Sequence, residues 1–235
     1  MRYLYGVDWT YILFMLPCLV LSLFAQAKVK TNFSKYSNVP NTRGITGAQA
    51  AQYVLNYYGV SGVRIEAVSG NLTDHFNPRT NVIRLSQSVY NVSSVAAIGV
   101  ACHEAGHAVQ HAQGYVPNKI RGAIIPAAKA GSTFGWILFF IGLLLPTTLG
   151  SFLWAGIILY SASVLFTIVT LPVEFDASKR ALQCIRETNL LYNEEYNGAK
   201  KVLQAAAMTY VAAAATSILQ LLRLIIIANG RSNRR

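Results

Sequence analysis

The feature that most constrains the fold is an uncharged stretch of 44 residues, at positions 130–173. Shorter uncharged stretches occupy positions 9–27 and 202–222. Because a helix needs about 20 apolar residues to cross a bilayer, the long stretch can cross twice and each shorter one once. Turn-forming residues at 146–151 separate the two crossings of the long stretch. The sequence therefore predicts an integral membrane protein, mainly α-helical, with about four transmembrane helices. Three spans are the alternative, because Arg223 interrupts the last apolar segment.

The distribution of charge predicts how the chain is oriented. The net charge is +11, although only 12% of the residues are charged, about half the fraction usual in soluble proteins. Fifteen of the 20 basic residues fall within positions 28–129 and 174–201, which four spans place on one side of the membrane. Basic loops favour the cytoplasmic side, although the basic tail at 231–235 opposes this orientation. We expect a multi-pass protein of the cell membrane that contacts anionic lipid and binds no nucleic acid.

The N-terminal apolar segment has two interpretations. Arg2 precedes it, and the small residues Ala25 and Ala27 end it, as in a cleaved signal peptide. The four-span topology instead favours an uncleaved anchor. The expected organisation is an N-terminal transmembrane anchor at 1–27, a segment with two metal-ligand histidines at 28–129, a transmembrane hairpin at 130–173, a helical segment at 174–201, a probable C-terminal transmembrane helix at 202–230 and a basic tail at 231–235.

Local patterns predict a small sheet and two helices within the segment 28–129, after polar and turn-like residues from 28 to about 45. Capping residues mark the starts of the helices, and alternating apolar residues mark the strands. A four-residue loop joins the two strands of a hairpin. In order, the expected elements are a helix from Thr46 to Tyr58, a strand at 63–68, a hairpin at 72–76 and 81–85, and a helix from Ser94 to Gly114.

The second of these helices carries a zinc-binding pattern. His103 and His107 are four residues apart, so both imidazoles lie on one face and can reach one Zn²⁺ at roughly 2.0–2.1 Å. Glu104 follows the first histidine, where it can take a proton from a water held by the metal. Three of the four histidines of the chain lie in this helix. The pattern therefore predicts a metal site with Glu104 as its general base.

A catalytic zinc keeps three protein ligands and one open position, so one more ligand is required. His111 is eight residues from His103, about 12 Å along a helix, which is too far to share the metal. Glu174 is the better candidate, because it follows the long uncharged stretch and so emerges on the side that holds His103. Its alternative role is that of an acid in the first turn of a helix. Asp176 competes for both roles or accepts a hydrogen bond from a ligand histidine, and Asp74 with His75 is a weaker option.

Several sequence runs together resemble the YugP-type bacterial membrane zinc metallopeptidases. The runs are LTDHFNPR at 72–79, RLS at 84–86, SVAA at 94–97, HEAGHA at 103–108 and LPVEFDAS at 171–178, and the similarity extends over nearly the whole chain. The last run is also similar to the Glu-aromatic-x-Ala-Asp pattern of membrane gluzincins, such as the heat-shock membrane protease and the prenyl-protein endopeptidase. The fit favours Glu174 as a ligand, whereas Ser178 stands where those enzymes have Asp.

The resemblance implies a zincin-like α+β catalytic domain, a small sheet plus the HExxH helix, inserted after the first span. It also implies a membrane-bound zinc metalloendopeptidase that hydrolyses membrane or membrane-proximal polypeptides. Further residues are candidates either for contacting the metal ligands or for stabilising the oxyanion, and they are His111, Asp176 and Ser178. For the oxyanion, three more side chains qualify: Tyr192, Tyr196 and Arg180. An intramembrane site-2-type protease is an alternative, but the apolar run before His103 is only about eight residues long. A second alternative is a catalytically silent membrane adaptor that binds zinc for a structural purpose. The sequence predicts no oligomeric state.

Overall fold

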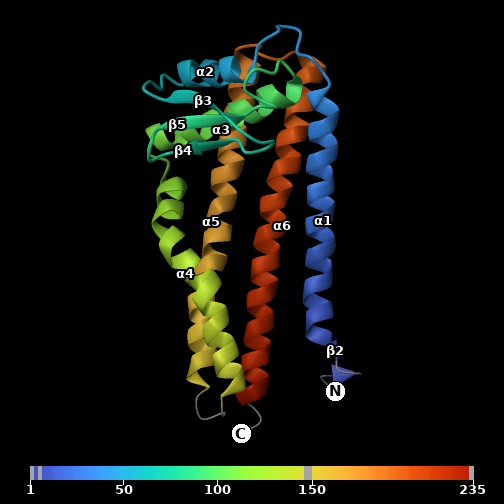
Figure 1. Ribbon diagram of the computed structural model, residues 1–235, viewed down its shortest axis with the longest axis vertical. Coiled ribbons are helices and arrows are strands. Elements are labelled where there is room, and N and C mark those ends of the chain that lie inside the picture. Colours follow the sequence, from blue (N-terminus) through green and yellow to red (C-terminus); the bar gives the residue numbers. More distant parts are fainter. Residues whose placement is uncertain (1–2, 5–6, 146–149, 233–235) are drawn as a thin grey trace. The chain divides into compact units, whose positions relative to one another are not determined.

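The computed structural model describes residues 3–4, 7–145 and 150–232, which form long helices and two small sheets (Figure 1). The expected turn at 146–149 lies outside the described residues. The elements are, in chain order, β1 (Tyr3–Leu4), β2 (Val7–Asp8), α1 (Trp9–Ser37), α2 (Gly47–Tyr57), β3 (Arg64–Val68), β4 (His75–Asn77), β5 (Val82–Ser86), α3 (Val95–Ala112), α4 (Val116–Leu144), α5 (Ser151–Glu187) and α6 (Asn193–Ser232).

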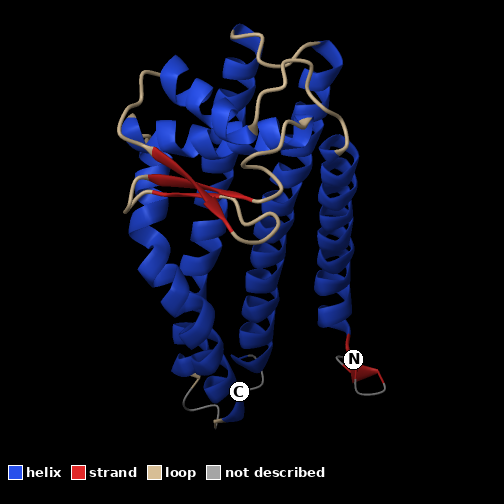
Figure 2. Ribbon diagram, turned by 45° about the horizontal axis from the view of Figure 1, so that its top comes forward, coloured by secondary structure: helices blue, strands red, loops and turns tan. Residues whose placement is uncertain are grey.

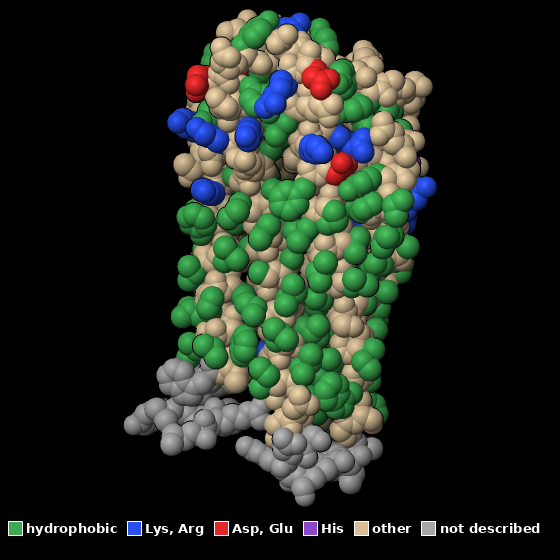
Figure 3. Space-filling view, turned by 180° about the vertical axis from the view of Figure 1, so that it is seen from behind, with side chains coloured by type: hydrophobic (Ala, Val, Ile, Leu, Met, Phe, Trp, Pro, Cys, Tyr) green, Lys and Arg blue, Asp and Glu red, His purple; other side chains and the backbone are tan. Residues whose placement is uncertain are grey.

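The chain divides into two compact units, and α1, α4, α5 and α6 each contribute to both. Unit 1 comprises Met1–Phe24, Lys119–Leu171 and Thr209–Arg235, and unit 2 comprises Ala25–Asn118 and Pro172–Met208. Within the described residues, four helices are long and apolar enough to cross a membrane, and they are α1, α4, α5 and α6. Figure 3 shows hydrophobic side chains spread over the visible surface of these helices. The expectation of about four transmembrane helices is confirmed at the level of length and composition.

Small residues bring α4 and α5 into close contact in unit 1. A Cβ atom added to Gly131 would collide with the backbone carbonyl of Leu159, and one added to Gly156 would lie 2.6 Å from the backbone nitrogen of Phe139. Helices in a membrane gain little from burying apolar surface, because lipid is equally apolar, and close backbone packing replaces that driving force. Gly131 of α4 and Gly156 of α5 therefore have a packing role.

Arg223 faces protein within unit 1, as a charged group in an apolar helix should. Its guanidinium carbon lies 5.0 Å from the centroid of the Tyr11 ring of α1, which is a cation–π distance. Helix α6 continues past Arg223 without interruption. The last apolar segment is thus a single helix, and the arginine does not end it.

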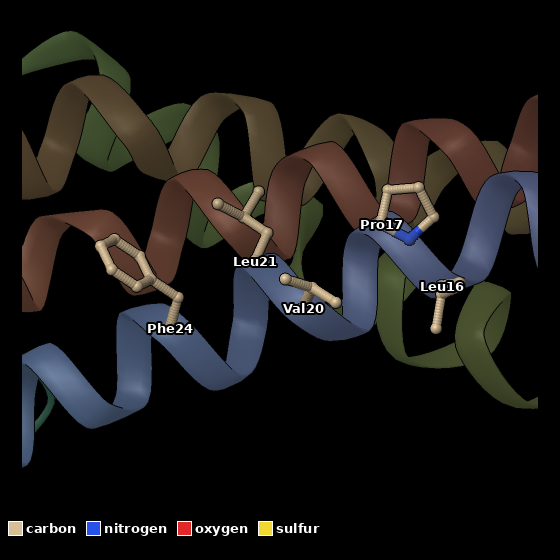
Figure 4. A pocket seen from close by; sticks show the side chains of 5 residues that line it. All are labelled: Leu16, Pro17, Val20, Leu21 and Phe24. Atoms are coloured by element: carbon tan, nitrogen blue, oxygen red, sulfur yellow. The ribbon is translucent and has the colours of Figure 1, made fainter.

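An open hollow lies along one face of α1 in unit 1 (Figure 4). All of its lining side chains are apolar: Leu16, Pro17, Val20, Leu21 and Phe24. Hydrolysis needs groups that move protons or polarise a carbonyl, and this lining offers none. The hollow is therefore an apolar surface feature of α1 rather than a candidate active site.

The three-stranded sheet of unit 2 has the order β3-β5-β4 (Figures 1 and 2). β5 pairs in parallel with β3 and antiparallel with β4. Because β5 is central, its side chains Val82, Ile83 and Leu85 are fully buried. Ile83 and Leu85 join the core with α2, α3 and the parts of α5 and α6 in this unit. β4 is an edge strand, and α3 contacts it.

The local predictions for unit 2 hold, with shifts at the hairpin. Thr46 and Gln49 form the expected capping box at the start of α2, and the Ser94 side chain caps α3 by accepting a hydrogen bond from the Ala97 backbone. Gly114 follows α3 with φ of +66°, a conformation that favours glycine. The first hairpin strand is shorter than expected, at residues 75–77. The four-residue loop is 78–81, one residue later than the sequence suggested.

Several helix ends differ from the sequence-based expectation. The segment from 28 to 37 is not turn-like but continues α1, because the Asn32 side chain donates to the carbonyl of Lys28, four residues earlier, and no glycine or proline intervenes. α4 already begins at Val116, with Pro117 at its first turn, where a missing N–H costs nothing. α5 runs through Pro172 to Glu187, so Glu174 lies inside a helix and not at its start.

Candidate metal centre

Helix α3 presents one face to the core and the other to the candidate site. Ile98, Ala101, Ala105 and Val109 are buried among the core residues of unit 2. The side chains of His103 and His107 remain 14% exposed. A helix with one apolar stripe buries that stripe and leaves its other positions free for chemistry. The burial of α3 thereby fixes the direction in which the two histidines point.

Gly106 allows α5 to approach this helix closely. A Cβ atom added at Gly106 would lie 2.5 Å from the backbone carbonyl oxygen of Ala177. Any larger residue would push the two helices apart. A glycine is needed at position 106 because it lets the turn of α5 that carries Glu174 come close to the two imidazoles.

Three donor atoms converge between α3 and α5. Nε2 of His103 lies 3.3 Å from Oε2 of Glu174, and Nε2 of His107 lies 3.4 Å from the same oxygen. The imidazole ring centroids are 4.7 Å apart, with an angle of 80° between the ring planes. Ligands bound tetrahedrally to zinc at roughly 2.0–2.1 Å are about 3.3 Å from one another. The donor set thus fits Zn²⁺ in both atom type and spacing.

The other predicted ligands lie outside this set. Among the described residues, His103, His107 and Glu174 form the one group of three or more side chains spaced to hold a metal ion. Asp74 instead accepts hydrogen bonds from the backbone and hydroxyl of Ser86, and His75 contacts the carbonyl of Thr73. Glu104 is buried but is not in the group, which leaves its carboxylate available for proton transfer.

A second layer of side chains holds each histidine. Nδ1 of His103 is 3.0 Å from Oγ of Ser178, and Nδ1 of His107 is 3.1 Å from Oε1 of Gln110. Asp176 is hydrogen-bonded to Gln110 instead, because its Oδ2 accepts from Nε2 of Gln110 at 2.8 Å. The sequence analysis overlooked Gln110. The signal was present, since Gln110 is three residues after His107 and seven after His103 and so shares their helix face.

The remaining candidates from the sequence have other neighbours. The His111 ring is exposed, and its centroid lies 5.7 Å from that of Phe76 on the edge strand β4. Nε of Arg180 donates to Asp176 at 2.6 Å. The hydroxyl of Tyr196 accepts from Arg186, and Tyr192 is exposed. Of these candidates for stabilising the oxyanion, His111 is the one that lies on α3 and contacts the edge strand β4.

The electrostatics of the site favour a bound cation. Burial lowers the pKa of the His107 imidazole, but its hydrogen bond to the Glu174 carboxylate and the nearby charge of Glu104 outweigh burial, so the pKa is raised above its ordinary value. The two carboxylates thus attract positive charge to this point, either as a proton or as a metal ion. Because zinc binds the neutral imidazole, the two compete for the same nitrogen.

Comparisons with known proteins identify the family of this chain. A family described as "Putative neutral zinc metallopeptidase" matches residues 11–229 of the chain. The chain is 46% identical over 222 residues to "Putative membrane protease YugP" of Bacillus subtilis (strain 168), covering 94% of this chain and 98% of that protein. No solved structure matches the chain significantly. The resemblance drawn from the sequence is confirmed: the chain belongs to the neutral zinc metallopeptidase family that the matching description names.

Proposed function

We propose that this protein is a membrane-bound, zinc-dependent metalloendopeptidase. One observation carries the proposal: Nε2 of His103 and Nε2 of His107 approach the same Glu174 oxygen at 3.3 and 3.4 Å. The family match and the four apolar helices support the same conclusion. The site contributes three protein donors, which is the number that a catalytic zinc uses when it keeps one position open.

The residues divide the work of hydrolysis between them. His103, His107 and Glu174 hold the ion. When bound, Zn²⁺ acts as a Lewis acid that makes water a stronger acid and polarises the substrate carbonyl. Glu104 accepts a proton as the water attacks the peptide carbonyl carbon, and it then gives that proton to the leaving amine. Glu104 is next to His103 in α3, so its carboxylate adjoins the ligands.

The edge of the sheet suggests how a polypeptide binds. β4 pairs with β5 on one side only, so its other side can pair with an extended chain. Because α3 contacts β4, a chain paired there would run beside the helix that carries both histidines. The four apolar helices keep the enzyme in the membrane. We therefore propose membrane or membrane-proximal polypeptides as substrates.

The two alternatives from the sequence have less support. A structural zinc is normally closed by four protein ligands, whereas the described residues supply a group of three. A site-2-type protease carries its metal ligands on membrane-spanning helices. In the described part of the chain, α3, which carries both histidines, is not among the helices that are apolar enough to span, although α5, which carries Glu174, is. These observations favour the open, catalytic site.

The proposed orientation places the site on the cytoplasmic side, following the excess of basic residues in the segments between spans. A cysteine at exposed position 87, in a variant whose three native cysteines are replaced by alanine, tests this. We expect a membrane-impermeant maleimide to label it only after the cells are permeabilised. Labelling in intact cells would reverse the orientation.

The decisive experiment for the enzymatic function compares two Glu→Gln substitutions in purified protein. Glu104→Gln should retain one equivalent of zinc but lose at least about a thousandfold of the cleavage of an unfolded, labelled polypeptide, because the proton acceptor is gone. Glu194→Gln, at an exposed position in the first turn of α6, is the matched control and should keep both zinc and activity. Equal cleavage by Glu104→Gln and the wild type would refute the general-base role.

A further inference from the structure

Gln110 is a buried polar residue that the reaction described above does not use. Its side chain is fully buried, and each of its polar atoms has a partner. Nε2 of Gln110 donates to the backbone carbonyl of Val173 at 2.7 Å and to Oδ2 of Asp176 at 2.8 Å. Oε1 lies 3.1 Å from Nδ1 of His107. A buried amide with this many partners has little freedom to move.

The orientation of this amide follows from the chemistry of its neighbours. The carbonyl of Val173 can only accept a hydrogen bond. Oδ2 of Asp176 is also an acceptor, because Nε of Arg180 donates to it at 2.6 Å. Rotating the amide by 180° would place Oε1 against these two oxygens. The NH₂ group must therefore face Val173 and Asp176, and Oε1 must face His107.

This orientation dictates which nitrogen of His107 is left for the metal. An amide oxygen only accepts, so Nδ1 of His107 must carry the hydrogen that it donates to Gln110. Nε2 is then the nitrogen whose lone pair can bind zinc. His103 differs, because its Nδ1 faces the hydroxyl of Ser178, which can either donate or accept. The two ligand histidines are thus held by groups of different chemistry.

We propose that Gln110 is a positioning residue for the metal site. Anchored to α5 through Val173 and Asp176, its amide holds His107 with Nδ1 protonated and Nε2 directed at the ion. The Asp176–Arg180 pair acts through Gln110, and not on a histidine directly. Partners in this position typically change metal affinity by about 10–100-fold. The proposal rests on the proposed zinc site, but it does not require that the bound ion cleave peptides.

The first test replaces the amide without changing the length of the side chain. Gln110→Met should weaken zinc binding by about 10–100-fold in competition with a chromophoric chelator. In zinc-loaded, histidine-¹⁵N-labelled protein, the wild type should show a slowly exchanging Nδ1–H signal from His107, which Gln110→Met should lose. Val109→Ala is the structural control, because Val109 is the adjacent buried residue of α3. It should lower the melting temperature while keeping both the zinc affinity and the signal.

A second pair of variants keeps the proposal testable if Gln110→Met does not fold. Asp176→Asn retains an oxygen that can accept from Gln110 and Arg180, so its zinc affinity should stay within about threefold of the wild type. Asp176→Ala removes that anchor and should weaken binding by about tenfold. Equal zinc affinities for Asp176→Asn and Asp176→Ala would overturn the anchoring role.

The outcomes separate this proposal from the proposed function. Wild-type zinc affinity in Gln110→Met, a retained Nδ1–H signal, or an equal loss of affinity in Val109→Ala would overturn the positioning role. A wild-type protein that binds no zinc would overturn it as well. If the wild type binds zinc and the variants behave as expected but no polypeptide is cleaved, the endopeptidase function fails while the role of Gln110 stands.

Discussion

Helix α5 makes a close contact through a glycine in each of the two units, with different consequences. In unit 1, its Leu159 carbonyl faces Gly131 of α4, among apolar side chains. In unit 2, its Ala177 carbonyl faces Gly106 of α3, and the neighbouring residues of α5 are Glu174, Asp176 and Ser178. The same kind of contact thus packs two helices in one unit and assembles donor atoms in the other.

This difference indicates that the proposed metal centre depends on helix packing as much as on the histidine motif. His103 and His107 are placed by the spacing of one helix, and that part of the site is local. Glu174, Ser178 and Asp176 reach it only because a glycine permits a short distance between two helices. Substitutions that separate the contribution of the histidine spacing in α3 from that of the contact between α3 and α5 will test this dependence.

The largest effect is expected where α5 supplies a ligand. Glu174→Ala removes the oxygen that both Nε2 atoms approach, so zinc affinity should fall by more than about a hundredfold, as measured by chelator competition. Asp176→Ala serves as the control from the same turn of α5 and should lose only about tenfold. If Asp176→Ala released the metal and Glu174→Ala did not, the assignment of the third ligand would be wrong.

The next largest effect is expected from alanine substitutions at the two glycine contacts. Gly106→Ala and Gly131→Ala each place a methyl group against a backbone carbonyl of α5, and overpacking of this kind costs about 1–3 kcal/mol. Both variants should melt at a lower temperature than the wild type. Only Gly106→Ala should also weaken zinc binding, because only that contact adjoins the ligands.

A third substitution controls for the change from glycine to alanine itself. Gly122, in the part of α4 that belongs to unit 1, has open space where a Cβ atom would stand. Gly122→Ala should therefore leave zinc affinity unchanged, with a melting temperature equal to or above that of the wild type. Zinc binding weakened equally in Gly106→Ala and Gly131→Ala would remove the distinction between the two contacts.

The sequence predicted the features that depend on near neighbours in the chain. The capping box at Thr46 and the cap at Ser94 involve residues three apart, and the two histidines share a face because they are four apart. The four apolar segments followed from their length and composition. These signals need no knowledge of the tertiary fold, which is why they could be interpreted from one sequence.

The features that the sequence did not predict are the lengths of two helices and the contacts between distant segments. The alternative role of Glu174 placed it in the first turn of a helix, yet α5 passes through Pro172 and Glu174 lies inside it, as apolar spanning helices often allow. The polar residues from 28 to 37 suggested a loop but continue α1. The role of Gln110 depends on Val173 and Asp176, more than 60 residues away, which meet it only when α5 packs on α3.

The smallest effect is expected at the position where this chain departs from the gluzincin pattern. Ser178→Ala removes one hydrogen bond to Nδ1 of His103 and should cost about 1 kcal/mol of zinc binding, about fivefold in Kd. The loss should be smaller than in Gln110→Met, because a rotatable hydroxyl restrains an imidazole less than an amide that two hydrogen bonds anchor to α5. Calorimetric zinc titrations of the two variants measure the difference. A larger loss in Ser178→Ala would contradict this expectation. It would show that the partner of His103 contributes more to zinc affinity than the partner of His107.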